Sequence, residues 1–214
     1  MSSILELKQL ELTKSEVIYG VSWEIYESLI TKYWGEQSPR LTYDSGIMEV
    51  EMSNSDKHEE AGRTLEFFLS EILIELEIDF RRFGSMTFKK QSIRKGFEPD
   101  ACFYIESLEK IEGKSNIGIE NKIPPDLTIE INRTSSSVPR MPIFAAFGVK
   151  EIWRFDGENV KFYTLEDRVY LETETSIALP MLSSKKATEF LQESHEMKST
   201  AWTKKVREWI NEQK

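Results

Sequence analysis

The chain has 214 residues, of which 39% are hydrophobic and 30% are charged, and its formal net charge is −9. This size and apolar content suffice for one hydrophobic core with a well-solvated surface. The negative charge excludes a protein that wraps nucleic acid through bulk charge, because phosphate binding requires Lys and Arg to displace counterions. No window approaches the roughly 18 apolar residues needed to span a bilayer, so we expect no membrane partner.

The single cysteine excludes an internal disulfide and suits a reducing compartment. The first residues, MSSILELKQLELTKSEV, carry acids and contain no long apolar run, so they do not resemble a signal peptide. We therefore expect a cytoplasmic protein.

Residues 1–35 are predicted to form a helical extension, because Trp23, Tyr26 and Tyr33 recur at helical spacing. The Asp-Ser-Gly at 44–46, between two alternating runs, predicts a β-hairpin. A polar start signal at 53–56 then precedes a long amphipathic helix over 57–78. Its apolar face consists of Leu65, Phe68, Leu69, Ile72, Leu73 and Leu76.

Strands and helices alternate in the rest of the chain. Strand-like segments are predicted over 78–84, 85–90, 100–105, 126–132 and 168–180, with a hairpin over 150–165 that turns at Asp156-Gly157 and a polar loop over 106–123. Helices are predicted over 138–148, capped by Gly148, and over the tail 185–214. This order predicts an α/β (α+β) fold in which helices pack on a mixed β-sheet.

Two carboxylates stand on predicted neighbouring strands. Asp100 begins one strand, and Glu130 lies inside an otherwise apolar strand, where an unpaired charge is costly. If the two converge, they suit a hard cation such as Mg²⁺, which polarises a phosphate and activates water. The alternative is that each acid pairs with a nearby Lys or Arg. On the long helix that precedes both strands, His58 is either a packing residue or a site residue, and Glu59 lies near enough to the helix start to reach a site.

Two further surfaces each allow two interpretations. The stretch 80–97 contains six basic residues and no acid, and forms either a solvated hairpin face or an anion-binding edge. Its basic residues are Arg81, Arg82, Lys89, Lys90, Arg94 and Lys95. In the tail, Trp202, Val206, Trp209 and Ile210 lie on one helix side, which either packs on the protein's own core or binds a partner.

Several motifs occur together over roughly residues 40–165. They are His58-Glu59, Gly84-Ser85-Met86-Thr87-Phe88, Gly96-Phe97-Glu98-Pro99-Asp100 with Phe103-Tyr104-Ile105, Pro125-Asp126-Leu127 with Glu130, and Gly148-Val149 with Glu151-Ile152-Trp153-Arg154. In them the chain resembles a bacterial family described as putative restriction endonucleases, within the PD-(D/E)XK nuclease superfamily. The resemblance implies a restriction-endonuclease-like core, placed here at 36–182, between the extension 1–35 and a helical extension at 183–214.

The resemblance also implies a site. Asp100 and Glu130 would be the metal ligands for Mg²⁺ or Mn²⁺, with His58 and Glu59 in support. The superfamily's Lys position is occupied here by Asn132, and Arg140 matches the place to which this family moves its Lys. Arg holds phosphate well but stays charged at ordinary pH, so it is a poor proton carrier.

The implied function is a homodimeric, metal-dependent DNA endonuclease whose basic residues Arg82, Lys89, Lys90, Arg94 and Lys95 guide the DNA backbone. One alternative is a nuclease fold that binds nucleic acid or protein without cutting. Another is a structural domain whose acids are ion-paired.

Overall fold

The computed structural model describes residues 16–32, 39–51, 56–84, 86–113, 123–131 and 138–214. Within these ranges the strands form two sheets. The five-stranded sheet contains β1 (Glu16–Tyr19), β2 (Arg40–Asp44), β3 (Ile47–Glu51), β5 (Phe88–Lys90) and β6 (Lys95–Phe97), in the order β1-β3-β2-β6-β5. The six-stranded sheet contains β4 (Arg81–Phe83), β7 (Ala101–Tyr104), β8 (Leu127–Ile131), β9 (Glu151–Phe155), β10 (Val160–Glu166) and β11 (Val169–Thr173), in the order β11-β10-β9-β8-β7-β4.

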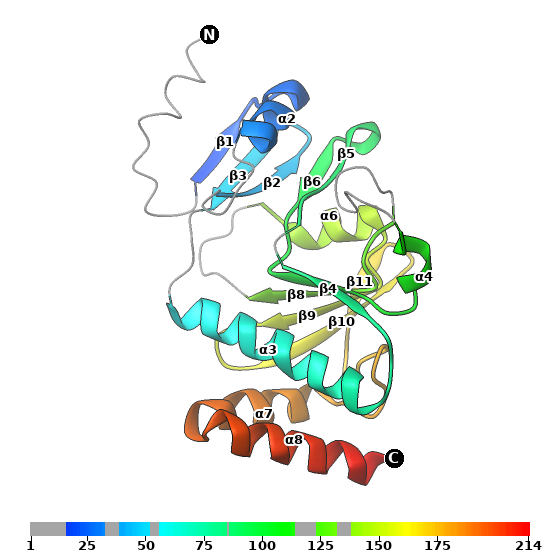
Figure 1. Ribbon diagram of the computed structural model, residues 1–214. Helices are drawn as coiled ribbons and strands as arrows, with labels where there is room; N and C mark the ends of the chain where they lie inside the picture. The colour runs from blue at the N-terminus through cyan, green and yellow to red at the C-terminus, as the bar shows by residue number, and fades with distance from the viewer. Residues whose placement is uncertain (1–15, 33–38, 52–55, 85, 114–122, 132–137) are drawn as a thin grey trace.

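The helices cover both sheets. They are α2 (Trp23–Lys32), α3 (Asp56–Glu75), α4 (Leu108–Ile111), α6 (Arg140–Phe147), α7 (Ser184–Glu196) and α8 (Ser199–Gln213). In Figure 1 the five-stranded sheet and α2 lie at the top, the six-stranded sheet lies in the middle, and α7 and α8 lie below α3. None of the helices in the described parts of the chain is long and apolar enough to cross a membrane.

The five-stranded sheet has one apolar and one polar face. The predicted hairpin is β2–β3, which turns through Ser45 and Gly46, both with positive φ, as a two-residue primed turn requires. Leu41 and Tyr43 of β2 join Met48 and Val50 of β3 in one apolar cluster with α2. Because side chains alternate along a strand, the intervening polar residues face the six-stranded sheet. They are Arg40, Thr42, Glu49 and Glu51, of which the last three are buried.

The helical prediction for residues 1–35 is wrong at 16–19, which form β1 and pair antiparallel with β3. The run Val17-Ile18-Tyr19 is β-branched and aromatic, which favours a strand, and Gly20 with φ 73° ends it. The helical spacing from Trp23 onward is correct and corresponds to α2. Residues 1–15 and 33–35 of this prediction lie outside the described residues.

The six-stranded sheet is mixed, as predicted: β8 and β9 are parallel, and its other pairs are antiparallel. The crossover between β8 and β9 contains α6, which ends at Gly148 in the left-handed conformation, as the sequence indicates. The strand predicted over 168–180 ends earlier, at Thr173, and forms a further hairpin with β10 through Asp167 and Arg168, both at positive φ. The predicted loop 106–123 contains the short helix α4.

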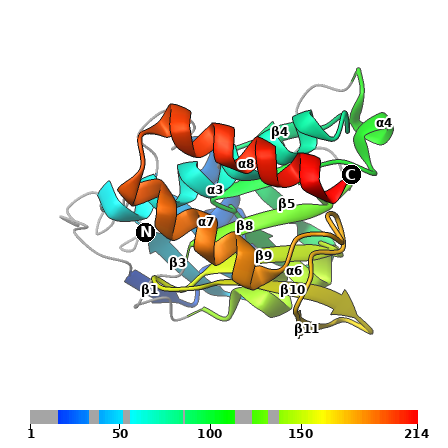
Figure 2. The same cartoon turned by 90° about the horizontal axis from the view of Figure 1, so that it is seen from below.

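The C-terminal helices complete the core on the α3 side of the six-stranded sheet (Figure 2). Trp202 of α8 is 3% exposed, and its indole Nε1 donates a hydrogen bond of 2.7 Å to the Phe190 carbonyl of α7. Val206 and Ile210 are fully buried beside it, and Trp209 is partly buried with its ring 5.5 Å from that of Phe190. This face of the tail therefore packs on the protein's own core.

We predict that Trp202→Ala lowers the free energy of unfolding by about 3–5 kcal/mol, because it removes a buried ring and leaves a cavity. Lys204→Ala on the same helix is the control: its side chain is 78% exposed, so we expect a change within about 0.5 kcal/mol. Urea unfolding measures both. Equal midpoints for the two variants would show that α8 is not part of the core.

Candidate active site

The candidate site lies where the ends of several elements meet between the two sheets. Arg40 is the first residue of β2, and Glu51 is the last residue of β3. Asp100 directly precedes β7, Glu130 lies near the end of β8, and Arg140 begins α6. Segments far apart in the sequence thus bring these five charged side chains into two groups of ion pairs, one around Asp100 and one around Arg140.

Asp100 and Glu130 occupy adjacent positions on neighbouring strands. Ala101 pairs with Ile129 in the antiparallel register. Asp100 precedes Ala101 and Glu130 follows Ile129, so the two residues stand at the next position of that register. The backbone N–H of Ile131 donates a hydrogen bond of 2.8 Å to Asp100 Oδ2. Both acidic side chains are less than 10% exposed. The two residues are therefore adjacent at the junction of β7 and β8.

Each of these carboxylates contacts an arginine. Arg40 forms an ion pair with Asp100 Oδ1. Arg140 Nη1 lies 2.9 Å from Glu130 Oε2 and 3.8 Å from Glu51 Oε2, and Arg140 Nη2 donates a 2.7 Å hydrogen bond to the Glu98 carbonyl. Burial opposes the charged form of Arg140, but the surrounding glutamates outweigh it and raise its pKa. Arg140 is therefore a permanent positive charge in this site.

The sequence reasoning missed three residues of this cluster, namely Arg40, Glu51 and Glu98. Glu51 is 2% exposed, and Glu49, on the same face of β3, is fully buried. Glu98 Oε1 accepts a hydrogen bond of 2.5 Å from Thr87 Oγ1, and its Oε2 accepts one of 3.3 Å from the Leu41 N–H. The sequence carried one signal, for Glu49 and Glu51. These acids alternate with Met48 and Val50, so one face of the strand is apolar and the other is acidic, and an acidic face requires polar surroundings.

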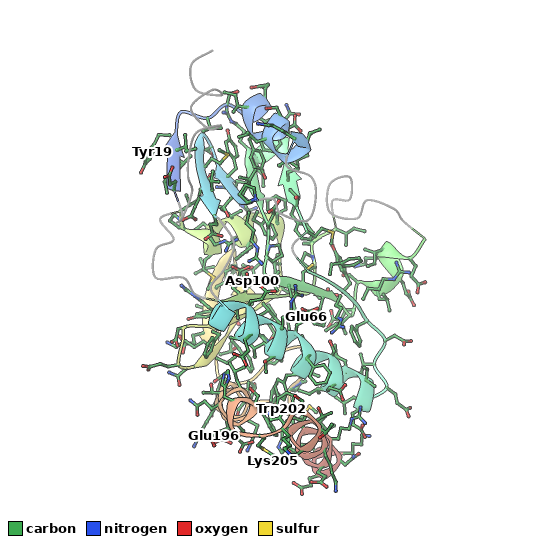
Figure 3. All side chains as sticks on the ribbon, turned by 60° about the vertical axis from the view of Figure 1, so that its left-hand side comes forward. Tyr19, Glu66, Asp100, Glu196, Trp202 and Lys205 are labelled. Carbon is green, nitrogen blue, oxygen red and sulfur yellow. The ribbon has the colours of Figure 1, made fainter. Side chains whose placement is uncertain are left out.

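Helix α3 borders the site on one side. A small cavity is lined by Arg40, Asp100 and Ile131 together with Glu59, Gly62, Arg63 and Glu66 of α3. Figure 3 shows Asp100 and Glu66 on the sheet side of α3, with Trp202 on the opposite side. Glu59 is about half exposed and pairs with Arg63 at 2.9 Å, so it reaches the same cavity as Asp100. The side chain of His58 and the whole of Asn132 lie outside the described residues.

The predicted basic residues lie on two different sheets. Arg82 is on β4, where it donates to Ser70 Oγ and lies 3.6 Å from Glu66. The other four lie along β5 and β6 and the turn between them. Lys89 pairs with Glu27 at 2.6 Å, and Lys95 pairs with Asp44. Arg94 Nη2 donates a hydrogen bond to the Tyr43 hydroxyl. Lys90 and Arg94 are exposed.

The donor chemistry of the site fits a hard cation with few protein ligands. Within the described ranges, no three Asp, Glu, His or Cys side chains are grouped so as to hold a metal ion. Mg²⁺, however, is commonly held by one or two carboxylates, with water and substrate phosphate completing its octahedron. Asp100 and Glu130 supply such a pair. A bound ion would have to share or replace their arginine partners.

The fold is similar to that of a solved structure described as a putative nuclease belonging to DUF820 from Anabaena variabilis ATCC 29413. The TM-score is 0.56 at 18% sequence identity, and the match covers 80% of this chain and 99% of that chain. The two proteins therefore share a fold. The model of the Uma2 family, described as "Putative restriction endonuclease", matches residues 23–195, and the chain belongs to this family. No curated protein matches the chain.

We predict a pH dependence from Glu98. Burial raises its pKa above the ordinary value of 4.5, although Thr87, Leu41 and the two arginines oppose this. An acid with a raised pKa in the folded state binds its proton more tightly there, so its contribution to stability is greatest below about pH 4.5 and is lost as the pH rises through the raised pKa.

Glu98→Gln has no proton to lose at this position. Between about pH 4.5 and 7, the free energy of unfolding of the natural protein should therefore fall relative to that of Glu98→Gln. Urea unfolding at several pH values measures the difference. Parallel curves, or a relative gain for the natural protein with rising pH, would contradict the assignment.

Proposed function

We propose that this protein is a metal-dependent DNA endonuclease that hydrolyses phosphodiester bonds with Mg²⁺ or Mn²⁺. The observation that carries the proposal is the meeting of Asp100 and Glu130 at adjacent positions of neighbouring strands, with Arg140 2.9 Å from Glu130. Membership of a family described as putative restriction endonucleases supports a nucleic acid as the substrate.

In this proposal Asp100 and Glu130 hold the ion, which when bound polarises the scissile phosphate and lowers the pKa of a water molecule. Arg140 neutralises charge that develops on the phosphate, a type of stabilisation worth several kcal/mol in a preorganised site. Arg140 neither donates nor accepts a proton in the reaction, because its raised pKa keeps the guanidinium protonated. Glu59, together with His58, would hold a water or ligand from the α3 side.

DNA would approach along the β5–β6 edge, where Lys90 and Arg94 are exposed. Lys89, Lys95 and Arg82 would add phosphate contacts by exchanging their present partners for phosphate oxygens. Such contacts position the backbone without reading sequence. We include in the proposal a two-fold homodimer, the commonest oligomer among soluble proteins, and a cytoplasmic location, because the one cysteine is buried and excludes an internal disulfide.

The second candidate function is a nuclease fold that binds nucleic acid or protein without cutting. The observation that favours it is the arginine contact at each carboxylate, which supplies positive charge where a metal ion would bind. The presence of Asn132 at the superfamily's Lys position and the net charge of −9 support the same candidate.

We predict that Mg²⁺ or Mn²⁺ stabilises the folded protein through Asp100 and Glu130. At a hundred times its dissociation constant, a ligand specific for the folded state adds about 2.7 kcal/mol to the free energy of unfolding. Thermal unfolding should therefore shift upward with either ion, and Asp100→Asn and Glu130→Gln should abolish the shift. Glu106→Gln, at a side chain 70% exposed, is the control and should keep it. A shift that survives both site substitutions would place the ion elsewhere.

We also predict that the protein nicks supercoiled plasmid DNA in the presence of Mg²⁺ or Mn²⁺. Asp100→Ala and Glu130→Ala should remove the activity, whereas Arg140→Lys should keep it within about tenfold, because a positive charge remains beside Glu130. Gel electrophoresis of the plasmid measures nicking, and a gel-shift assay on the same samples measures binding. Nicking that persists in both Ala variants would reveal a contaminant, and binding without nicking would favour the second candidate.

A further inference from the structure

The two arginines of the site are held in different ways. Arg140 is anchored by the Glu98 carbonyl at 2.7 Å as well as by Glu130 and Glu51, so its position does not depend on one carboxylate. Arg40 reaches Asp100 from the five-stranded sheet, and its side chain is 17% exposed beside the cavity on α3. Arg40 is therefore the arginine that lies at the cavity and directly contacts Asp100.

We propose that Arg40 is the built-in counter-ion of Asp100, and that a divalent cation and the Arg40 guanidinium compete for the same carboxylate oxygen. This inference rests on the proposed metal site and adds a residue that sets the affinity of that site. In the metal-free protein Arg40 neutralises Asp100. When the ion binds, Arg40 leaves Asp100.

The geometry of the carboxylate supports direct competition. Oδ2 of Asp100 already accepts the Ile131 N–H at 2.8 Å, and this bond belongs to the junction of β7 and β8. Oδ1 is the oxygen that pairs with Arg40. Mg²⁺ must approach a carboxylate oxygen to about 2.0–2.1 Å and carries a full shell of ligands, so a guanidinium cannot remain on the same oxygen.

The cavity gives the displaced guanidinium somewhere to go. Arg40 shares it with Glu59 and Glu66, which lie on α3 opposite Asp100. Arg63 also lines this cavity, but its partners are Glu59 at 2.9 Å and Glu66 at 3.0 Å. Arg40 and Arg63 therefore bring the same charge to one cavity, and of the two only Arg40 is shown in an ion pair with Asp100 among the described residues.

The test compares Mn²⁺ binding by the natural protein, Arg40→Gln and the matched control Arg63→Gln, measured by calorimetric titration and by thermal shift. Apparent affinity scales with the fraction of molecules competent to bind, so if the ion pair is open about a tenth of the time, Arg40→Gln tightens Mn²⁺ binding about tenfold. Arg63→Gln should change it less than about threefold, since Arg63 pairs with Glu59 and Glu66 and its charge acts on Asp100 only from a distance.

A second readout is the melting temperature, which does not require a binding constant for the metal. Without Mn²⁺, Arg40→Gln leaves Asp100 lacking its guanidinium and should melt below the natural protein, and Mn²⁺ should raise its melting temperature more than that of the natural protein. If Arg40→Gln fails to fold, Arg40→Lys replaces it in the test. This variant keeps a positive charge but presents a single ammonium group. Its affinity for Mn²⁺ should lie between that of the natural protein and that of a protein without the ion pair.

The outcomes separate this inference from the proposed function. If neither the natural protein nor the Arg40 variants bind Mn²⁺, the metal site itself is refuted, and the inference with it. If the natural protein binds Mn²⁺ and the Arg40 variants bind it equally or more weakly, the metal site stands and the competition is refuted. An equal gain from Arg63→Gln would also refute it, by showing a general effect of charge.

Discussion

The structure depends on the burial of Arg140 among acids from both sheets. Its guanidinium contacts Glu130 of the six-stranded sheet, Glu51 of the five-stranded sheet and the Glu98 carbonyl between them. Removing one partner of a buried pair leaves an uncompensated charge, which typically costs about 3–5 kcal/mol. The polar faces of the two sheets are therefore held together by the same charges that make up the candidate site.

This arrangement explains why so many acids are tolerated away from water. Buried charges are stable when paired and hydrogen-bonded. On β3, Glu49 and Glu51 are buried on the face turned toward the six-stranded sheet, because the opposite face of β3 packs on α2. A site of this kind is rich in acids, and its arginine contacts hold those acids in place. Family membership agrees with a nuclease, and in the proposed function the arginine partners set the conditions under which a metal could bind.

The sequence was most informative where pattern and position coincide. The alternation around Glu130 and the Pro-Asp before β7 indicated that Asp100 and Glu130 could converge, and β7 and β8 are indeed antiparallel neighbours with Ala101 opposite Ile129. The five-stranded sheet was not predicted, because β6 has three residues and includes Gly96, whose missing side chain makes room for the Tyr26 hydroxyl. The pattern of a single sequence does not reveal such long-range packing. It also does not reveal that Arg40 lies beside Asp100, because the two residues are sixty positions apart in the chain.

In the proposed function, Asp100 and Glu130 together hold one divalent cation. Crystals grown or soaked with Mn²⁺ test this most directly, through the anomalous signal of the ion. We expect one strong peak between the two carboxylates, with the Arg40 guanidinium moved off Asp100. Crystals that contain Mn²⁺ but show no peak there, with the pairs Arg40–Asp100 and Arg140–Glu130 both intact, would contradict it.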